Sequence, residues 1–205
     1  MARPAVDSSG GERERICAAL VESVAGRGYQ ATSVDHVVEL AGVDHAAFAR
    51  HFDSLEECFA AAWEQVDGEL SRVMATAFGR GGDWQDRLRD ALDAGLEYLA
   101  SDESRARVYV AEVVYVNEGM RDRQRDALAR LSATVDRGRE AAGESHRATP
   151  AGIAEAVAGA IWHRVHQLVQ SGRGADLPDE VPRFMYIAVL PYRGAAAAEA
   201  ELARS

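Results

Sequence analysis

The chain has 205 residues, of which 47% are hydrophobic and 27% are charged, and these are the proportions of an ordinary globular protein. Its formal net charge of -10 argues against broad, nonspecific affinity for nucleic acid or for anionic membranes. No apolar run approaches the roughly 20 residues of a membrane span. Because residues 1–15 also lack the apolar segment of a signal peptide, we expect a cytoplasmic protein without membrane partners.

Apolar residues at helical spacing predict an all-α protein, since no segment alternates as a strand does. Caps are expected at Thr32 and Ser33 together, at Asp44 and at Ser54, and Pro150 after Thr149 suits the first turn of a helix. Pro191 is expected to bend or interrupt the last helix. About nine helices are predicted, over residues 12–25, 33–41, 45–52, 55–78, 83–100, 102–116, 121–142, 150–171 and 182–204.

The helix lengths predict a division into parts. Residues 1–10 have the composition of a flexible arm. Residues 11–53 form three short helices, and the predicted helix over 55–78 joins them to a larger bundle within residues 54–205. Two loops, 143–149 and 171–182, separate the last three helices of that bundle.

The most informative stretch is 28–59, which has the pattern of a helix-turn-helix. Capping residues precede an apolar-periodic helix, Gly42 permits a tight turn, and a second helix carries Phe48 and Phe52. This motif places its second helix in the major groove of DNA. The outward residues there are candidates for DNA contact, with Arg50 suited to a guanine or a phosphate. The candidate set is Thr32, Ser33, His45, Ala46, Ala47, Ala49, Arg50 and His51.

The sequence over about 50 residues resembles the tetracycline-repressor (TetR) family of transcriptional regulators. The resemblance rests on Ile16, Ala19, Leu20, Gly28-Tyr29, Thr32-Ser33-Val34, Val37-Val38, Ala41-Gly42-Val43, Phe48, His51-Phe52, Ser54, Glu56-Glu57 and Trp63. It implies a bacterial regulator, typically a repressor, with an N-terminal helix-turn-helix domain and a C-terminal helical bundle. It also implies a homodimer that binds a double-stranded DNA operator and is released from it by a small effector.

The candidate DNA surface departs from the family pattern. Ala49 stands where the family usually has tyrosine, and Leu55 stands where it usually has lysine, so two typical phosphate contacts are missing. Residues 1–57 hold five arginines against ten acidic residues. Because phosphate neutralisation supplies much of protein–DNA affinity, two hypotheses remain. The chain is either a working regulator with few contacts, or a TetR-like relic that binds a ligand or a partner without binding DNA.

The resemblance implies two roles for the later helices. The helices over 150–171 and 182–204 are expected to form a homodimer interface, because Ile153, Val157 and Ile161 lie on one wide apolar face beside small residues. An effector cavity for a hydrophobic ligand is expected among the helices over 55–142. Its candidate lining is Phe78, Trp84, Leu88, Tyr98, Tyr109, Glu112, Val113, Tyr115, Met120, Leu128, Trp162 and His166.

Other chemistry has little support in the sequence. Cys17 and Cys58 have no CxxC partner and lie among apolar residues, so we expect both to be buried, with a redox role as the alternative. His163 and His166 lie three residues apart, but no further ligand completes a metal site. We find no nucleophile motif and no phosphate-binding or dinucleotide-binding motif. We therefore expect neither a catalytic site nor a metal or organic cofactor.

Overall fold

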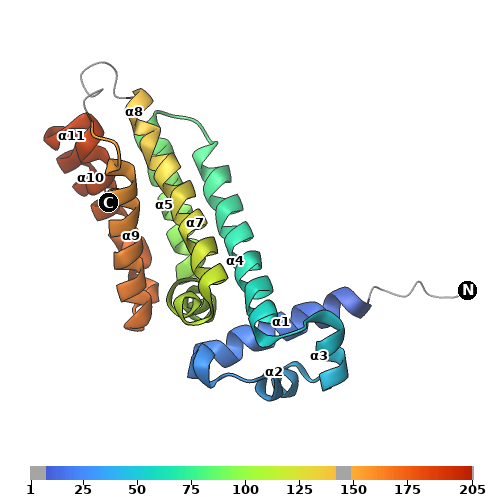
Figure 1. Cartoon of the computed structure of the whole chain (residues 1–205). Helices are drawn as coiled ribbons and strands as arrows, with labels where there is room; N and C mark the ends of the chain where they lie inside the picture. Colours follow the sequence, from blue (N-terminus) through green and yellow to red (C-terminus); the bar gives the residue numbers. More distant parts are fainter. Residues whose placement is uncertain (1–7, 142–148, 205) are drawn as a thin grey trace, which may run out of the picture.

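A computed structural model describes residues 8–141 and 149–204 of the chain, and these residues are helical and contain no strand (Figure 1). The all-α expectation is confirmed. Residues 1–7 and 142–148 lie outside the described residues, and with them most of the expected arm over 1–10 and most of the expected loop over 143–149. Residues 8–10, which we expected within the arm, belong to the first helix, α1, which begins at Ser8.

Three helices form the N-terminal unit: α1 (Ser8–Arg27), α2 (Val34–Ala41) and α3 (His45–His51). A 3-10 turn, η1 (Tyr29–Ala31), links α1 to α2. The spacing of apolar residues in the sequence did not predict this turn. Ser33 caps α2 by accepting a hydrogen bond from the amide of His36, and Asp44 caps α3 by accepting one from Ala47. The side chains of α1 that face α2 and α4 are apolar, so the unit has a continuous core.

A long helix, α4 (Leu55–Phe78), begins in the N-terminal unit and runs into the bundle, where α5 (Trp84–Ala100) packs along it (Figure 1). Ser54 and Asp83 cap these helices as their side chains accept amide hydrogen bonds from Glu57 and Asp86. Buried apolar residues occur along α4 from Cys58 to Phe78. Because α4 contributes to the core of both parts, it fixes the N-terminal unit against the bundle.

The predicted helix over 102–116 is wrong as a single element. The chain forms α6 (Glu103–Ala106), then a π-helix, η2 (Arg107–Glu112), and then a 3-10 turn, η3 (Val113–Tyr115). Apolar periodicity does not distinguish these helix types, because burial on both sides of the segment makes nearly every residue apolar. The next helix, α7 (Glu118–Asp136), starts before the predicted Arg121, and a short α8 (Gly138–Ala141) follows it.

The C-terminal helices are α9 (Ile153–Gln170), α10 (Val181–Arg193) and α11 (Ala195–Leu202), with a 3-10 helix, η5 (Gly174–Glu180), inside the expected loop over 171–182. The predicted start at Thr149 and Pro150 is wrong, since Gly152 is the N-cap of α9. The predicted interruption at Pro191 is also wrong. Pro191 lies within α10, and the break occurs at Gly194, whose φ of 79° favours glycine.

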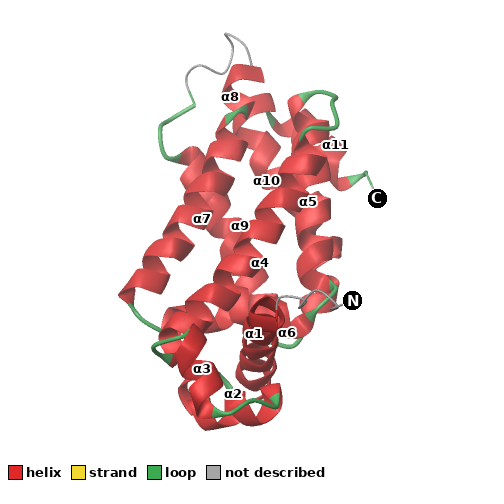
Figure 2. Ribbon diagram, turned by 90° about the vertical axis from the view of Figure 1, so that its right-hand side faces the viewer, coloured by secondary structure: helices red, strands yellow, loops and turns green. Residues whose placement is uncertain are grey.

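The molecule is elongated, with α2 and α3 at one end and α8, α10 and α11 toward the other (Figure 1, Figure 2). One buried apolar cluster extends from α1 through α4 to α10 and α11. A carboxylate anchors the C-terminal helix to α5, because the buried Glu201 pairs with Arg89 at 2.6 Å. No helix among the described residues is long and apolar enough to cross a membrane.

Candidate DNA-binding surface and ligand cavity

Local capping fixes the turn that presents α3. Ser33 and His36 form a reciprocal capping box at the start of α2, and Gly42 closes that helix with φ 62° and ψ 40°, a left-handed conformation that suits glycine. Thr32 does not cap α2, contrary to one expectation. It is only 8% exposed, and its hydroxyl donates to the carbonyl of Gly28 at 3.0 Å. Its side chain therefore stabilises the link between α1 and α2.

The outer face of α3 carries few polar side chains. His45, Ala46, Ala49 and Arg50 are exposed. The side chain of Ala47 is not available for contact with DNA, because Ala47 is only 3% exposed and packs in the core; its proposed role is wrong in that respect. Ala46 and Ala47 are adjacent in the chain, but successive residues of a helix are rotated by about 100°. This rotation places Ala46 on the outer face and Ala47 on the inner face.

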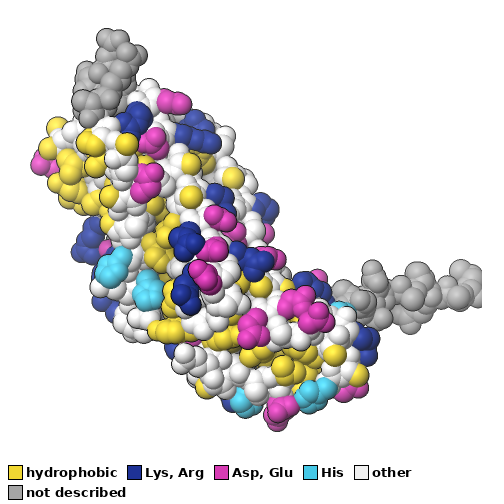
Figure 3. Space-filling model, viewed as in Figure 1, with side chains coloured by type: hydrophobic (Ala, Val, Ile, Leu, Met, Phe, Trp, Pro, Cys, Tyr) yellow, Lys and Arg dark blue, Asp and Glu magenta, His cyan; other side chains and the backbone are white. Residues whose placement is uncertain are grey.

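Acidic side chains already pair with the arginine and the histidines of this surface. Glu12 of α1 accepts hydrogen bonds from Arg50 at 3.1 Å and from His51 at 3.0 Å. Hydrogen bonds from His51 and then Arg50 lower the pKa of Glu12, so the carboxylate stays ionised. The Nε2 of His45 likewise lies 2.7 Å from the carboxylate of Asp35 on α2. On the face seen in Figure 3, acidic groups lie among histidines and apolar groups over this unit.

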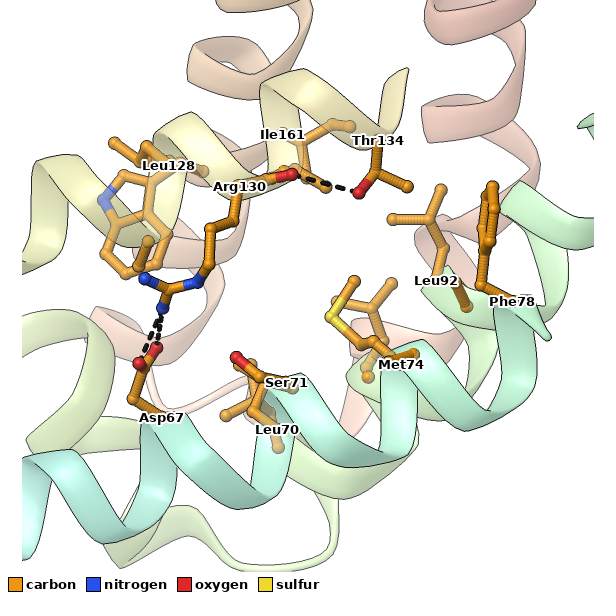
Figure 4. A pocket seen from close by; sticks show the side chains of 18 of the residues that line it. Asp67, Leu70, Ser71, Met74, Phe78, Leu92, Leu128, Arg130, Thr134 and Ile161 are labelled. Atoms are coloured by element: carbon orange, nitrogen blue, oxygen red, sulfur yellow. Dashed lines mark hydrogen bonds and ion pairs between the residues drawn. The ribbon is translucent and has the colours of Figure 1, made fainter. Parts of the chain in front are cut away.

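A cavity of about 520 Å³ lies between α4, α5, α7 and α9, within the range typical of small-molecule sites (Figure 4). Its walls are mostly apolar, with Leu70, Met74 and Phe78 of α4 facing Leu128 and Thr134 of α7. From Asp67 to Phe78, the wall formed by α4 extends about 16 Å at the helical rise. The cavity is therefore long enough for an extended ligand.

Part of the predicted lining surrounds this cavity. Phe78, Leu128, Tyr109 and Trp162 line it, and the ring of Tyr109 lies edge-on to Trp162 with centroids 5.9 Å apart. The aromatic residues come from three elements that are distant in sequence, so only the packing of the bundle brings them together. Trp84, Leu88, Tyr98, Glu112, Val113, Tyr115, Met120 and His166 are not among the lining residues.

The misplaced candidates have other surroundings. Trp84 packs in the core against Gly138 and Tyr192, while Tyr115 is exposed. Glu112 faces the N-terminal unit, and His166 lies on α9, where burial and the nearby His163 lower its pKa. The residues most clearly missed are on α4: Asp67, Leu70, Ser71 and Met74. Their spacing of three or four residues marks one helix face, but periodicity does not reveal whether such a face meets a cavity or a neighbouring helix.

The two ends of the cavity differ in charge. At one end Asp67 accepts hydrogen bonds from Arg130 at 2.6 Å and from the hydroxyl of Tyr109 at 2.8 Å, so its charge is compensated. At the other end the guanidinium groups of Arg87 and Arg137 lie 4.2 Å and 5.1 Å from the ring centroid of Phe78. Among the described residues neither arginine has a carboxylate partner. Within 8–141 and 149–204, no carboxylate therefore neutralises the positive charge at this end.

The outer surface of α9 and α10 was expected to be a wide apolar face. That expectation is wrong for Val157 and Ile161, which are buried in the chain's own core. The face that remains exposed on α9 is narrower; it holds the small residues Ala156, Gly159 and Ala160, with polar side chains beside them at Glu155, His163 and Gln167. Leu190 of α10 is 38% exposed. A helix with such small side chains permits close approach of another helix.

The metal-ligating side chains and the two cysteines form no further site among the described residues. No cluster of three or more metal-ligating side chains occurs within 8–141 and 149–204. Cys17 and Cys58 are free and buried, as expected. The sulfhydryl of Cys17 and apolar burial both raise the pKa of Cys58, so this thiol stays protonated.

Comparison with known proteins places this geometry in context. Residues 16–62 match the model of the bacterial regulatory proteins of the tetR family. None of the curated proteins compared is similar to the sequence. Among solved structures, the fatty acid degradation regulator FadR from Bacillus halodurans is similar with a TM-score of 0.76 and 18% identity, over 95% of this chain and 97% of that one.

Two other solved structures share the fold. FadR from Bacillus subtilis, solved in complex with stearoyl-CoA, has a TM-score of 0.74 and 19% identity, over 88% of this chain and 98% of that one. A tetR-family regulatory protein from Rhodococcus RHA1 has a TM-score of 0.70 and 21% identity, over 88% and 96%. Residues 16–62 therefore match the tetR family of bacterial regulatory proteins, and the chain shares the all-α fold of these solved structures.

Proposed function

We propose that the chain is a DNA-binding transcriptional repressor that a small effector releases from its operator. The single observation that supports this most strongly is the exposed outer face of α3, presented by a capped helix-turn-helix that α4 joins to a ligand-sized cavity. We assign residues 11–53 to DNA binding and residues 54–205 to effector binding and dimerisation. The described start of α1 at Ser8 moves the structural boundary of the first part slightly earlier.

The DNA contacts are assigned to the exposed groups of the motif. Arg50 and His45 are the candidates on α3 for contact with a base or a phosphate, and Ala46 and Ala49 allow the helix to approach base edges closely. Ser33 marks the start of α2, where backbone amides favour a phosphate oxygen. His51 is only 11% exposed on its side chain, so its contribution requires the contact with Glu12 to open.

The homodimer is assigned to the exposed faces of α9 and α10. Ala156, Gly159 and Ala160 are three small exposed residues of α9, and Leu190 is an exposed apolar residue on α10. In a twofold dimer each such face meets its own copy. Two copies then present two α3 helices to the half-sites of a palindromic operator.

The effector is assigned to the cavity and has an apolar body with an anionic end. Its body lies against the apolar walls, and its anionic end lies near Arg87 and Arg137, which pair with no carboxylate among the described residues. A structurally similar protein has been solved with stearoyl-CoA, which combines an acyl chain and an anionic group. That likeness supports a ligand of the same general chemistry.

Binding to the duplex upstream of the chain's own gene tests the proposal. We expect sequence-specific binding at about 0.1 M salt that Arg50→Ala weakens, with the slope of log K against log salt reduced by about one. The matched control is Arg72→Ala, an exposed arginine on α4 that pairs with Glu69 at 2.5 Å, far from α3. Equal affinity for the chosen duplex and a random one, even at low salt, would reject DNA recognition.

A second hypothesis is a ligand-binding or partner-binding dimer without DNA recognition. The pairing of Arg50 and His51 with Glu12 favours it, because DNA must compete with a carboxylate that is already in place. The same binding experiment separates the hypotheses. A protein that binds an amphiphilic probe in the cavity and shows no preference among duplexes is described by this second hypothesis.

A further inference from the structure

A buried carboxylate connects the bundle to the helix-turn-helix. Glu112, the last residue of the π-helix η2, is only 7% exposed. Its Oε2 accepts a hydrogen bond at 2.9 Å from the backbone amide of Tyr29, which lies 83 residues earlier in the chain. Tyr29 is the first residue of the turn η1, so this amide has no partner within the turn itself. Glu112 therefore satisfies a donor at the junction of α1 and α2.

The surroundings of this contact leave the carboxylate little freedom. Its oxygens lie 3.6 Å and 3.9 Å from the position that a Cβ would occupy on Gly28. The ring of Tyr29 is held separately, edge-on to Phe59 of α4 with centroids 5.2 Å apart. On the other side, Arg107 lies 3.4 Å from Glu112. Because a buried carboxylate is costly without such partners, the segment is held in one register by both contacts.

The same π-helix supplies a wall of the ligand cavity. Tyr109 lines the cavity, donates its hydroxyl to Asp67 and stacks on Trp63 of α4 at 5.0 Å. Its carbonyl accepts a hydrogen bond from the indole of Trp63 at 3.1 Å. Tyr109 and Glu112 thus face two different places from one short segment, and α6 at its start lies beside α1 (Figure 2).

The segment from Arg107 to Glu112 is a π-helix, whose hydrogen-bond register differs from that of an α-helix by one residue. Its hydrogen bonds join residues five apart, which is also the spacing of Arg107 and Glu112. Conversion of one turn to α-helical bonding changes the register by one residue and rotates the following residues by about 100°. A change of hydrogen-bond register at Tyr109 would therefore turn the side chain of Glu112 away from the Tyr29 amide. Short π segments of this kind are frequent at functional sites.

We propose that Glu112 is a positioning residue that transmits occupancy of the cavity to the helix-turn-helix, through its hydrogen bond to the amide of Tyr29. A ligand that displaces the ring of Tyr109 changes the register of η2, and the start of α2 then loses an anchor. Its regulatory meaning rests on the proposed function. The contacts of Tyr109 with Asp67 and of Glu112 with Tyr29 do not, because they lie within the chain itself.

Amide hydrogen exchange across residues 28–33 of the full chain tests the contact. We expect Glu112→Ala to speed exchange there by at least about tenfold, since it removes the acceptor. Glu112→Gln keeps an acceptor oxygen and is expected to restore most of the protection. The matched control is Glu180→Gln, which changes another buried glutamate, one held by Arg164 at 2.6 Å in the C-terminal part of the bundle. It should leave residues 28–33 unchanged.

A double-variant cycle tests the transmission. Tyr109→Phe keeps the ring but removes its hydrogen bond to Asp67, and we expect it to alter exchange at residues 28–33 in the otherwise native protein. In the Glu112→Ala background the same change should have no further effect there. Additive effects of the two substitutions would overturn the proposal. So would faster exchange in Glu112→Ala that is spread evenly over the whole chain, because that pattern reports a general loss of stability.

Addition of sodium decanoate as a probe, followed by binding to the upstream duplex, separates this inference from the proposed function. If the exchange cycle is non-additive but no duplex binds specifically, the coupling stands and the DNA function fails. If a duplex binds and decanoate weakens binding equally in the native protein and in Glu112→Ala, the DNA function stands and transmission through Glu112 fails.

Discussion

Arg50 of α3 lies 3.1 Å from the carboxylate of Glu12 on α1, so the main cation of the proposed recognition helix is already paired within the protein. The same carboxylate accepts a hydrogen bond from His51 at 3.0 Å. Both partners of the Arg50 contact are at the surface, where such a pair contributes little to stability. Its larger consequence is for binding, because a phosphate must displace Glu12 before it meets Arg50.

Removal of this carboxylate is predicted to strengthen DNA binding. Glu12→Gln frees Arg50 and His51 and should raise affinity for the upstream duplex by about two- to fivefold, the range of an exposed ion pair. Fluorescence anisotropy measures the change. The control is Glu14→Gln, which alters the net charge equally at an exposed position of α1. Equal gains from both variants would show that net charge, and not release of Arg50, is responsible.

A large charged residue on the small-residue face of α9 is predicted to dissociate the dimer. Ala160→Arg introduces a long cation at an exposed position where the proposed interface requires close approach. We expect a shift from dimer to monomer in sedimentation experiments, with helicity retained. Ala129→Arg, at an exposed position of α7, should leave the mass unchanged. A dimer that tolerates Ala160→Arg would place the interface elsewhere.

The two ends of the cavity are predicted to respond differently to the loss of an arginine. A double Arg87→Gln and Arg137→Gln variant should bind decanoate about fivefold more weakly, because both groups lose an interaction with its carboxylate. Affinity for 1-decanol should change little. Trp162 lines the cavity, so its fluorescence is a suitable signal.

The control for this prediction lies at the opposite end of the cavity. Arg130→Gln removes a cation that Asp67 already neutralises. It should therefore reduce the affinity for decanoate less than the double variant does. A larger loss of decanoate affinity in Arg130→Gln than in the double variant would reverse the assigned orientation of the ligand.

Gly138 is predicted to tolerate no side chain. A Cβ at this position would lie 2.6 Å from Trp84, whose ring fills the space above α8. Gly138→Ala should lower the free energy of unfolding by about 1–3 kcal/mol, which urea denaturation measures. By contrast, Gly68→Ala on α4 meets nothing within 4 Å and should raise it by about 0.5–1 kcal/mol. Similar stabilities of the two variants would contradict the packing around Trp84.

His166 is predicted to make the protein less stable in mild acid. Burial, and then the charge of His163, lower the pKa of His166 in the folded state. The unfolded chain therefore binds a proton first, and the free energy of unfolding falls as the pH decreases through about 6.5 toward the folded-state pKa. His166→Gln should reduce this loss in urea denaturation between pH 7.5 and 5.5. An identical pH dependence in both proteins would exclude His166 as its source.

Local chemistry was sufficient to predict the helix-turn-helix. Ser33, Asp44 and Ser54 cap helices as predicted, because a cap depends on residues only three positions apart. Gly42 likewise adopts the left-handed conformation that the turn requires. The π-helix was not predictable in this way, since Arg107 to Glu112 differ from an α-helix only in the register that the surrounding core imposes.

The sequence by itself determined the all-α class, the caps and the family resemblance, because these follow from periodicity and from short-range hydrogen bonding. Only the tertiary structure decided which aromatic residues line the cavity, since Phe78, Tyr109 and Trp162 come from separate elements and Trp84 packs elsewhere. It also decided that Arg50 is paired with Glu12 and that Glu112 contacts Tyr29. Such contacts depend on how whole helices pack, and no local pattern in the chain encodes that arrangement.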